Sequence, residues 1–182
     1  FLRLDHRAYV VANVLLKEGL PDNFYDLFLL GDGELPSLKG GPDPARWHHA
    51  IDVIDATWTV GGKSDRAVLT MYWPMPFDGS RFQIIVPDAL QNLGSQFVPL
   101  LADTLALVNL DLSHVEQVRL TRWGHALPIA APNFIASGDA ERAHAPIDDK
   151  VFFVQQDNWA LPAVENTLLD AYAFAPLAAI GL

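Results

Sequence analysis

The feature that most constrains the fold is an apolar segment that passes through a short polar stretch into a long apolar helix pattern. Val151 to Val154 is a run of β-branched and aromatic residues, which is typical of a strand covered on both faces. After the polar residues Gln155 to Asn158, apolar residues recur at helical spacing from Ala160, with Pro162 in the predicted first turn. Such a turn gathers free backbone N–H groups at the positive end of a helix, where α/β proteins hold electron-rich ligand atoms. Many strand–helix units bind nothing, so the pattern alone leaves both outcomes open.

The composition excludes several classes of partner and site. Hydrophobic residues make up 51% of the 182 residues and charged residues 19%, which favours a folded chain with a substantial core. The net charge of −10 argues against nucleic acid and anionic membranes as partners. The lack of cysteine excludes disulfides, thiolate metal sites and a cysteine nucleophile. No apolar run reaches the length of a membrane span, so we expect a soluble protein, cytoplasmic or periplasmic.

The rest of the chain predicts an α+β fold with a mixed or antiparallel sheet and one long helix. The helix pattern covers Pro87 to Leu107, and the five candidate strands are Ala8–Leu16, Phe24–Leu30, Ile51–Val60, Ala67–Trp73 and Val115–Trp123. Glycine- and proline-rich residues 31–47 and residues 128–145 are expected to be loops, and a hairpin turn is expected around residues 61–65. We expect two regions, 1–125 and 126–182. The first residue is Phe rather than Met, so we expect the chain to begin within a longer protein.

Three short motifs have plain structural explanations. The pair His48-His49 is a poor metal site, because adjacent side chains rarely point the same way. Asp148-Asp149 before Lys150 is typical of a solvated turn, and Gly31-Asp32-Gly33 lacks the third glycine of a phosphate-binding loop. The Gly-x-Ser-x-Gly pattern of an α/β-hydrolase is absent from the sequence.

The segment Arg122-Trp123-Gly124-His125-Ala126-Leu127-Pro128 is a stronger candidate. A strand that ends in Trp-Gly-His offers an aromatic wall, a backbone that a ligand can approach closely and a titratable group. The structural alternative is a packed Trp with a half-buried His, and both remain open. A cofactor-free hydrolase that uses His125 with an acidic partner has little support, because no activated nucleophile is visible.

The segments 122–128 and 151–165 together resemble the C-terminal part of FAD-dependent amine oxidoreductases, the superfamily of monoamine and polyamine oxidases and phytoene-desaturase-like enzymes. The resemblance covers about the last 60 residues, with Gln156-Asp157 where the family has Gly-Asp and Leu161 to Val164 where it has Glu-Gly-Ala-Val. Upstream, Tyr9 to Leu20 is similar to an edge of the family's substrate-domain sheet. The resemblance implies that the terminal strand–helix unit completes a Rossmann-like FAD-binding domain supplied by an N-terminal dinucleotide-binding half, from the same precursor or a partner subunit.

The resemblance also implies roles for individual residues. Asp157 would bind a ribityl hydroxyl of FAD, and the backbone beyond it would lie by the flavin ring; the implied cofactor-binding residues are Gln156, Asp157, Trp159, Ala160, Leu161 and Pro162. The implied catalytic residues His125, Trp123 and Trp159 would line the substrate at the flavin face. The expected function is thus the C-terminal portion of a flavin-dependent oxidoreductase, in which a small organic substrate such as an amine transfers a hydride to FAD.

Three departures from the family pattern limit what the resemblance implies. The Gly-x-Gly-x-x-Gly unit is missing, so the isolated chain is expected to be inactive. The approximate register puts Val11 or Ala12 where many amine oxidases have a lysine beside the flavin, and Gln156 adds bulk where the family has glycine. The alternative is a non-catalytic binding or assembly module that has lost the cofactor.

Overall fold

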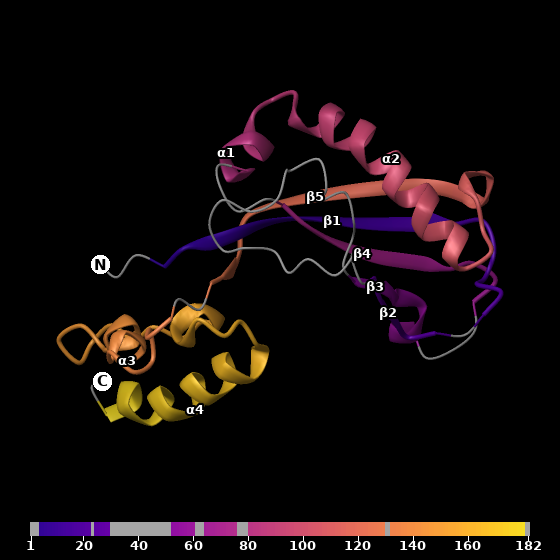
Figure 1. Ribbon diagram of the computed structural model, residues 1–182. Helices are drawn as coiled ribbons and strands as arrows, with labels where there is room; N and C mark the ends of the chain where they lie inside the picture. Colours follow the sequence, from indigo (N-terminus) through magenta and orange to yellow (C-terminus); the bar gives the residue numbers. More distant parts are fainter. Residues whose placement is uncertain are drawn as a thin grey trace. The chain divides into compact units, whose positions relative to one another are not determined.

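The computed structural model describes residues 4–22, 24–29, 52–60, 64–75, 80–129 and 132–180. The chain divides into two compact units (Figure 1). We call Arg7–His125 the sheet unit, and Phe1–His6 with Ala126–Leu182 the elbow unit. Within the described residues, no helix is both long enough and apolar enough to cross a membrane.

The sheet unit is built on five strands in the order β2-β3-β4-β1-β5. Their bounds are β1 His6–Leu16, β2 Asp26–Phe28, β3 Asp52–Asp55, β4 Val68–Pro74 and β5 Val115–Pro128. The pairs β1–β4, β3–β4 and β2–β3 are antiparallel. Backbone bonds from Lys17 to His114 and from Ile129 to Asp5 show that β5 runs antiparallel to β1 as well. The predicted α+β fold with an antiparallel sheet is confirmed at this level.

One face of this sheet forms the main core. Alternate residues of β1, among them Val10 and Val14, are fully buried, as the period of a strand requires. Helix α2, Ala89–Leu107, crosses this face after the short helix α1, Ser80–Ile85 (Figure 1). Its buried stripe includes Phe97, whose ring lies 6.0 Å from that of Trp73. The stripe was predicted from helical spacing, although Leu90 at its start is 48% exposed.

The elbow unit has a smaller core around Phe134, Ala140 and Ala160. Three elements surround it: α3 Asp139–His144, the 3-10 turn η4 Gln156–Trp159, and α4 Val164–Ile180. Leu4 and Trp159 pack against the same core, so residues from both ends of the described chain contribute to one unit.

The predicted strand Val151 to Val154 is wrong. Among the described residues, this segment makes only an isolated bridge between Val151 and Ile147. Val151 and Val154 are 49% and 42% exposed, so the segment is not buried on both faces. A strand of that kind needs neighbouring strands on each side, and the described part of the elbow unit supplies none.

The start of the last helix also differs from the prediction. Helix α4 begins at Val164 rather than near Ala160. Ala160 has a left-handed φ of 50°, and Leu161 is kept out of the helical conformation by the proline that follows it. Pro162 therefore lies before the helix instead of in its first turn.

Four smaller expectations need correction. Residues Ala56–Val60 form a 3-10 turn, η2, instead of continuing β3, because the Asp55 carboxylate accepts bonds from the backbone N–H and hydroxyl of Thr57. Helix α3 lies inside the segment expected to be a loop, and β5 continues beyond the expected end. Strand β1 is not an edge strand, since it lies between β4 and β5. The motifs Gly31-Asp32-Gly33 and His48-His49, the loop 31–47 and residues 61–63 of the expected hairpin turn lie outside the described residues.

Candidate functional site

The elbow itself is a single 3-10 turn that ends in a left-handed residue. The backbone N–H of Ala160 donates to the carbonyl of Asp157 across 2.9 Å, and Ala160 is 2% exposed in the small core. Asn158 N–H donates to the Gln155 carbonyl at 3.5 Å. These bonds fix the backbone of the elbow, which sets the directions of the Asp157 and Asn158 side chains.

A buried carboxylate anchors the elbow to α4. Asp170 is 4% exposed and Asn158 is 1% exposed. The amide of Asn158 donates to Asp170 Oδ2 at 2.5 Å, and Trp159 Nε1 donates to Asp170 Oδ1 at 3.2 Å. The same amide nitrogen also donates to the carbonyl of Phe153 at 2.9 Å. Both oxygens of the buried carboxylate therefore have donors, which offsets the cost of removing the charge from water.

The ring of Trp159 is packed within the elbow unit. The imidazole of His144 lies 4.5 Å from it, between centroids, and Phe174 lies 6.3 Å from that imidazole. His144 is held in turn by a 2.6 Å contact with the carbonyl of Ala140. Trp159 therefore packs within the core of this unit, because its N–H donates to Asp170 and its ring contacts His144.

The carboxylate of Asp157 contacts a residue that is far away in the sequence. Its Oδ2 lies 3.2 Å from Nε2 of His6, and the other ring nitrogen of His6 lies 3.0 Å from the carbonyl of Leu4. The second oxygen of Asp157, Oδ1, is buried and has no hydrogen-bond partner among the described residues. Asn158 Oδ1 is in the same condition. Both oxygens lack a donor but are buried, so a ligand hydroxyl group would reach them only after the elbow rearranges.

The other predicted cofactor-binding residues offer a cofactor fewer hydrogen-bonding groups. Gln156 and Leu161 are exposed, and Pro162 is half-buried and has no N–H. The N–H of Ala160 is already bonded to Asp157. The side chain of Asp157 therefore has the acceptor that a hydroxyl-bearing cofactor such as FAD requires, but this oxygen is buried, and the backbone at Ala160 and Pro162 offers that cofactor no free donor.

Trp123 and His125 lie on β5 and share one side of it, because side chains alternate along a strand. A Cβ placed on Gly124 would lie 3.3 Å from Cγ of Arg81 in α1, so Gly124 faces the helices. Arg122 also reaches toward the helices, since its Nη1 donates to the carbonyl of Ile84 at 2.8 Å. Trp123, which is 53% exposed, and His125 therefore point to the opposite side of the sheet.

That opposite side carries a band of polar and aromatic residues, which we call the polar face: Asp26, Asp52, Thr70, Tyr72, Tyr9, Asn13, Trp123 and His125. The strand registers place Asp52 opposite Tyr72 and Asn13 opposite Thr70, so each pair shares a face. Thr70 Oγ1 donates to Asn13 Oδ1 at 2.9 Å. Apart from the exposed Trp123 and His125, these side chains are half-buried.

Asp52 is the most perturbed acid of the polar face. Desolvation first, and then a hydrogen bond and charge repulsion from Asp26, raise the pKa of Asp52 from 3.8 to about 6. Burial also raises the pKa of Tyr9, with a smaller contribution from the charge of Asp52. A carboxyl group whose pKa is raised toward neutral is typical of functional sites, although ion-pair networks raise pKa values as well.

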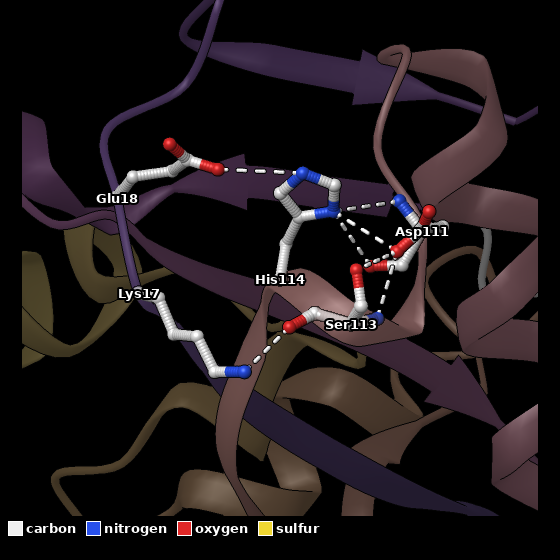
Figure 2. Close-up of polar contacts among 5 residues, drawn as sticks. All are labelled: Lys17, Glu18, Asp111, Ser113 and His114. Carbon is white, nitrogen blue, oxygen red and sulfur yellow. Dashed lines mark hydrogen bonds and ion pairs between the residues drawn. The ribbon is translucent and has the colours of Figure 1, made fainter.

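A second polar cluster lies where β1 ends and β5 begins (Figure 2). His114 Nε2 lies 3.3 Å from a carboxylate oxygen of Glu18, and Lys17 Nζ donates to the Ser113 carbonyl at 2.6 Å. Ser113 donates to Asp111 Oδ1 twice, from Oγ at 2.5 Å and from its backbone N–H at 2.8 Å. These two hydrogen bonds lower the pKa of Asp111. In a serine hydrolase the imidazole must instead face the hydroxyl. This cluster therefore closes the turn η3, Leu112–His114, and activates no nucleophile.

The structure gathers the predicted residues into two groups: Trp123 and His125 on the polar face of the sheet unit, and residues 156–162 at the elbow. Sequence reasoning missed His6, Asp52 and Asp170. An acid within the apolar pattern of α4 was a detectable signal for Asp170, because a lone charge on an apolar helix is usually partnered. Asp148 and Asp149 form the exposed turn that was expected. No group of three or more potential metal ligands occurs in the described part of the chain.

No protein-family model matches this chain, and no curated protein matches it.

Proposed function

We propose that this chain is the C-terminal portion of a flavin-dependent oxidoreductase. It contributes the substrate-domain sheet and a flavin-contacting elbow, and the intact protein transfers a hydride from a small organic substrate, such as an amine, to FAD. A dinucleotide-binding half, from the same precursor or from a partner subunit, supplies the rest of the cofactor site. Bound FAD would accept the hydride.

The observation that carries the proposal is the exposed apolar surface of the elbow unit. Leu168, Leu169 and Tyr172 of α4 are 63%, 65% and 85% exposed. From Ala171 to Ile180 every residue of α4 is apolar or aromatic, and a helix of that composition is normally buried in a larger core. Val151 and Val154 are exposed as well. An added parallel sheet would cover both surfaces and complete a Rossmann-like domain.

Two further features support a cofactor at the elbow and a substrate beside the sheet. The unpartnered Oδ1 of Asp157 is an acceptor of the kind that a ribityl hydroxyl needs, and it is buried until the elbow rearranges around a cofactor. On the polar face, Trp123, Tyr72 and Asp52 provide aromatic surface and a carboxyl group, which suit a small substrate with a cationic nitrogen.

The test uses the natively purified full-length protein. We expect flavin bands in its visible absorption spectrum, and mass spectrometry of every chain should reveal a Gly-x-Gly-x-x-Gly segment. Asp157→Ala should lower flavin affinity roughly tenfold, the loss expected for one hydrogen bond to a charged group. Glu141→Ala, which removes an exposed acid of the same unit, is the matched control. A colourless, folded protein that takes up no added FAD would contradict the proposal.

One observation favours the alternative of a non-catalytic binding or assembly module. The backbone of the elbow offers few free donors, since the N–H of Ala160 is engaged and Pro162 has none. In that case the partner half would still associate through α4, but no flavin would be retained. Co-purification of the two halves without flavin absorbance distinguishes this alternative from the oxidoreductase.

A further inference from the structure

We propose that the outer edge of β5 binds a short, acidic, extended segment of a partner protein, which adds to the sheet as a further strand. In the strand order, β5 ends the sheet beside β1, so one of its two edges has no neighbouring strand among the described residues (Figure 1). An extended peptide binds to such an edge through main-chain hydrogen bonds, while its alternate side chains determine specificity. This interaction does not depend on a flavin.

The outer edge of β5 is long and its backbone groups lack partners. Strand β5 has 14 residues, whereas β2 at the other edge of the sheet has 3. Apart from the ladder with β1, residues 116–128 make no backbone–backbone hydrogen bond within the described part of the chain. The backbone groups of an antiparallel strand point alternately to its two sides, so about half of those in β5 point outward. These groups are the donors and acceptors that an added strand needs.

Regular pairing can extend over only part of this edge. A backbone bond from Lys17 to His114 and another from Ile129 to Asp5 tie the two ends of β5 to β1. Between these bonds the chain advances 15 residues along β5 but 12 along β1, so the 3 extra residues of β5 must be accommodated in bulges. Because a bulge bends its strand and interrupts regular pairing, this edge favours a short segment over a long one.

Three arginines along this edge have no acidic partner. Arg119 and Arg122 lie on β5. Arg81 lies on α1, with its Cγ 3.3 Å from the position of a Cβ on Gly124. All three are exposed, and none forms an ion pair with a carboxylate in the described ranges. Arg122 donates to the carbonyl of Ile84, which leaves its charge unbalanced. The edge therefore attracts carboxylate groups.

The charge of the edge favours an acidic segment over a second copy of this chain. Glu116, the one acid in the sequence of β5, is already paired with Arg66 at 3.0 Å. The charge left unbalanced along the strand is therefore positive, although the chain as a whole has a net charge of −10. Pairing β5 with β5 of a second copy would bring together two positive edges and two negative chains, and both contacts are repulsive. Carboxylates of an added strand would instead lie across from Arg119 and Arg122.

Exposed apolar side chains on β5 provide contacts for the other residues of the segment. Val118 is 37% exposed and Trp123 is 53% exposed. Each is next to an arginine in the sequence, and neighbouring side chains of a strand point to opposite faces. A segment in which acidic residues alternate with β-branched ones therefore matches both the charge and the apolar surface of this edge.

The experiment titrates the full chain of 182 residues with an acetylated probe peptide of about eight residues, in which glutamate and valine alternate. We expect calorimetry to show binding that weakens roughly tenfold when lysine replaces the glutamates, because like charges then face each other. A third peptide keeps the glutamates but has proline in place of valine. It should also bind roughly tenfold more weakly, because proline cannot donate to the ladder.

Charge reversal in the protein tests the same contact from the other side. Arg119→Glu should weaken binding of the glutamate peptide roughly tenfold and strengthen binding of the lysine peptide. The gain for the lysine peptide would also show that the variant is folded. Lys150→Glu makes the same change of charge at an exposed position of the elbow unit, and it should bind both peptides as the wild type does.

Amide hydrogen exchange shows where the peptide binds. Added protection should occur within residues 116–128 and not in β2. No binding of the glutamate peptide, or equal binding of the glutamate and proline peptides, would overturn the proposal, since the latter result indicates charge attraction without strand addition. Sedimentation should show a monomer before the peptide is added. A dimer in which the same amides are already protected would assign this edge to a second copy of the chain instead.

Discussion

Two carboxylates show how the surroundings of a single residue decide its chemistry. Asp170 is almost fully buried, yet each of its oxygens accepts a hydrogen bond, from Asn158 and from Trp159. Asp52 is less buried but has another acid, Asp26, as its neighbour. The first arrangement stabilises a charge inside the protein, whereas the second favours a retained proton. Asp170 is therefore a structural anchor, and Asp52 is the acid that responds to pH.

The raised pKa of Asp52 predicts a pH-dependent stability. Its pKa is 3.8 when unperturbed and about 6 in the folded protein, so between these values the folded state keeps a proton that the unfolded state has lost. The stabilisation is complete below about pH 4 and is lost as the pH rises through about 6. Asp52→Asn should therefore raise the free energy of unfolding by about 1 kcal/mol at about pH 8, after allowance for solvent screening. Near pH 3 it should have little effect.

Urea denaturation of the wild type and Asp52→Asn at the two pH values measures this difference. Asp65→Asn, at an exposed position of the same unit, is the control and should change stability equally little at both. A gain from Asp52→Asn that is the same at both pH values would show that proton retention is not its cause.

At the scale of elements, the best predicted parts are those whose pattern is complete within one segment. Strand β1 and helix α2 were predicted because alternation and a helical stripe are local consequences of burying one face. Val151 to Val154 has an equally clear strand pattern, but a strand needs partners that a single segment cannot specify. The start of α4 was missed because the conformation of Ala160 depends on the turn around it.

Helix α2 provides a direct test of the core. Phe97 is 2% exposed and its neighbour Val98 is 50% exposed. Phe97→Ala should destabilise the sheet unit by about 4 kcal/mol, because it leaves a cavity against Trp73. Val98→Ala on the outer side should change stability by less than about 0.5 kcal/mol. Thermal or urea unfolding followed by tryptophan fluorescence measures both, and similar losses would mean that α2 does not pack by this face.

Some features of the candidate site can be predicted from one segment of the sequence, whereas others depend on contacts between residues that are far apart in the chain. The shared face of Trp123 and His125 follows from two-residue spacing on a strand, which the sequence displays directly. The chemistry of Asp52 depends on Asp26 from another strand, and that of Asp157 depends on His6. Contacts between such distant residues leave no periodic pattern in the chain, so a single sequence did not reveal them.

At the scale of the whole molecule, the exposed side of α4 predicts association rather than folding energy. Leu168 is 63% exposed, and Leu107 on α2 is a matched position at 64%. Neither Leu168→Glu nor Leu107→Glu should lower the stability of this chain by more than about 0.5 kcal/mol. Only Leu168→Glu should weaken binding of a separately expressed dinucleotide-binding half, by at least tenfold, because it buries an unpaired charge in the proposed interface. Calorimetric titration measures the affinity, and equal binding by both variants would exclude α4 from the interface.

The interleaved path of the chain has a consequence for the entropy of folding. The elbow unit needs residues 1–6 together with residues 126–182, with the whole sheet unit between them. Closing a flexible loop of that length carries an entropic cost that grows with the logarithm of its length. Because β1 and β5 are neighbours, the folded sheet already brings Asp5 and Ile129 within a 2.8 Å hydrogen bond. The pairing of β1 with β5 thus shortens the loop that has to be closed, because it holds the two chain segments that lead into the elbow unit next to each other.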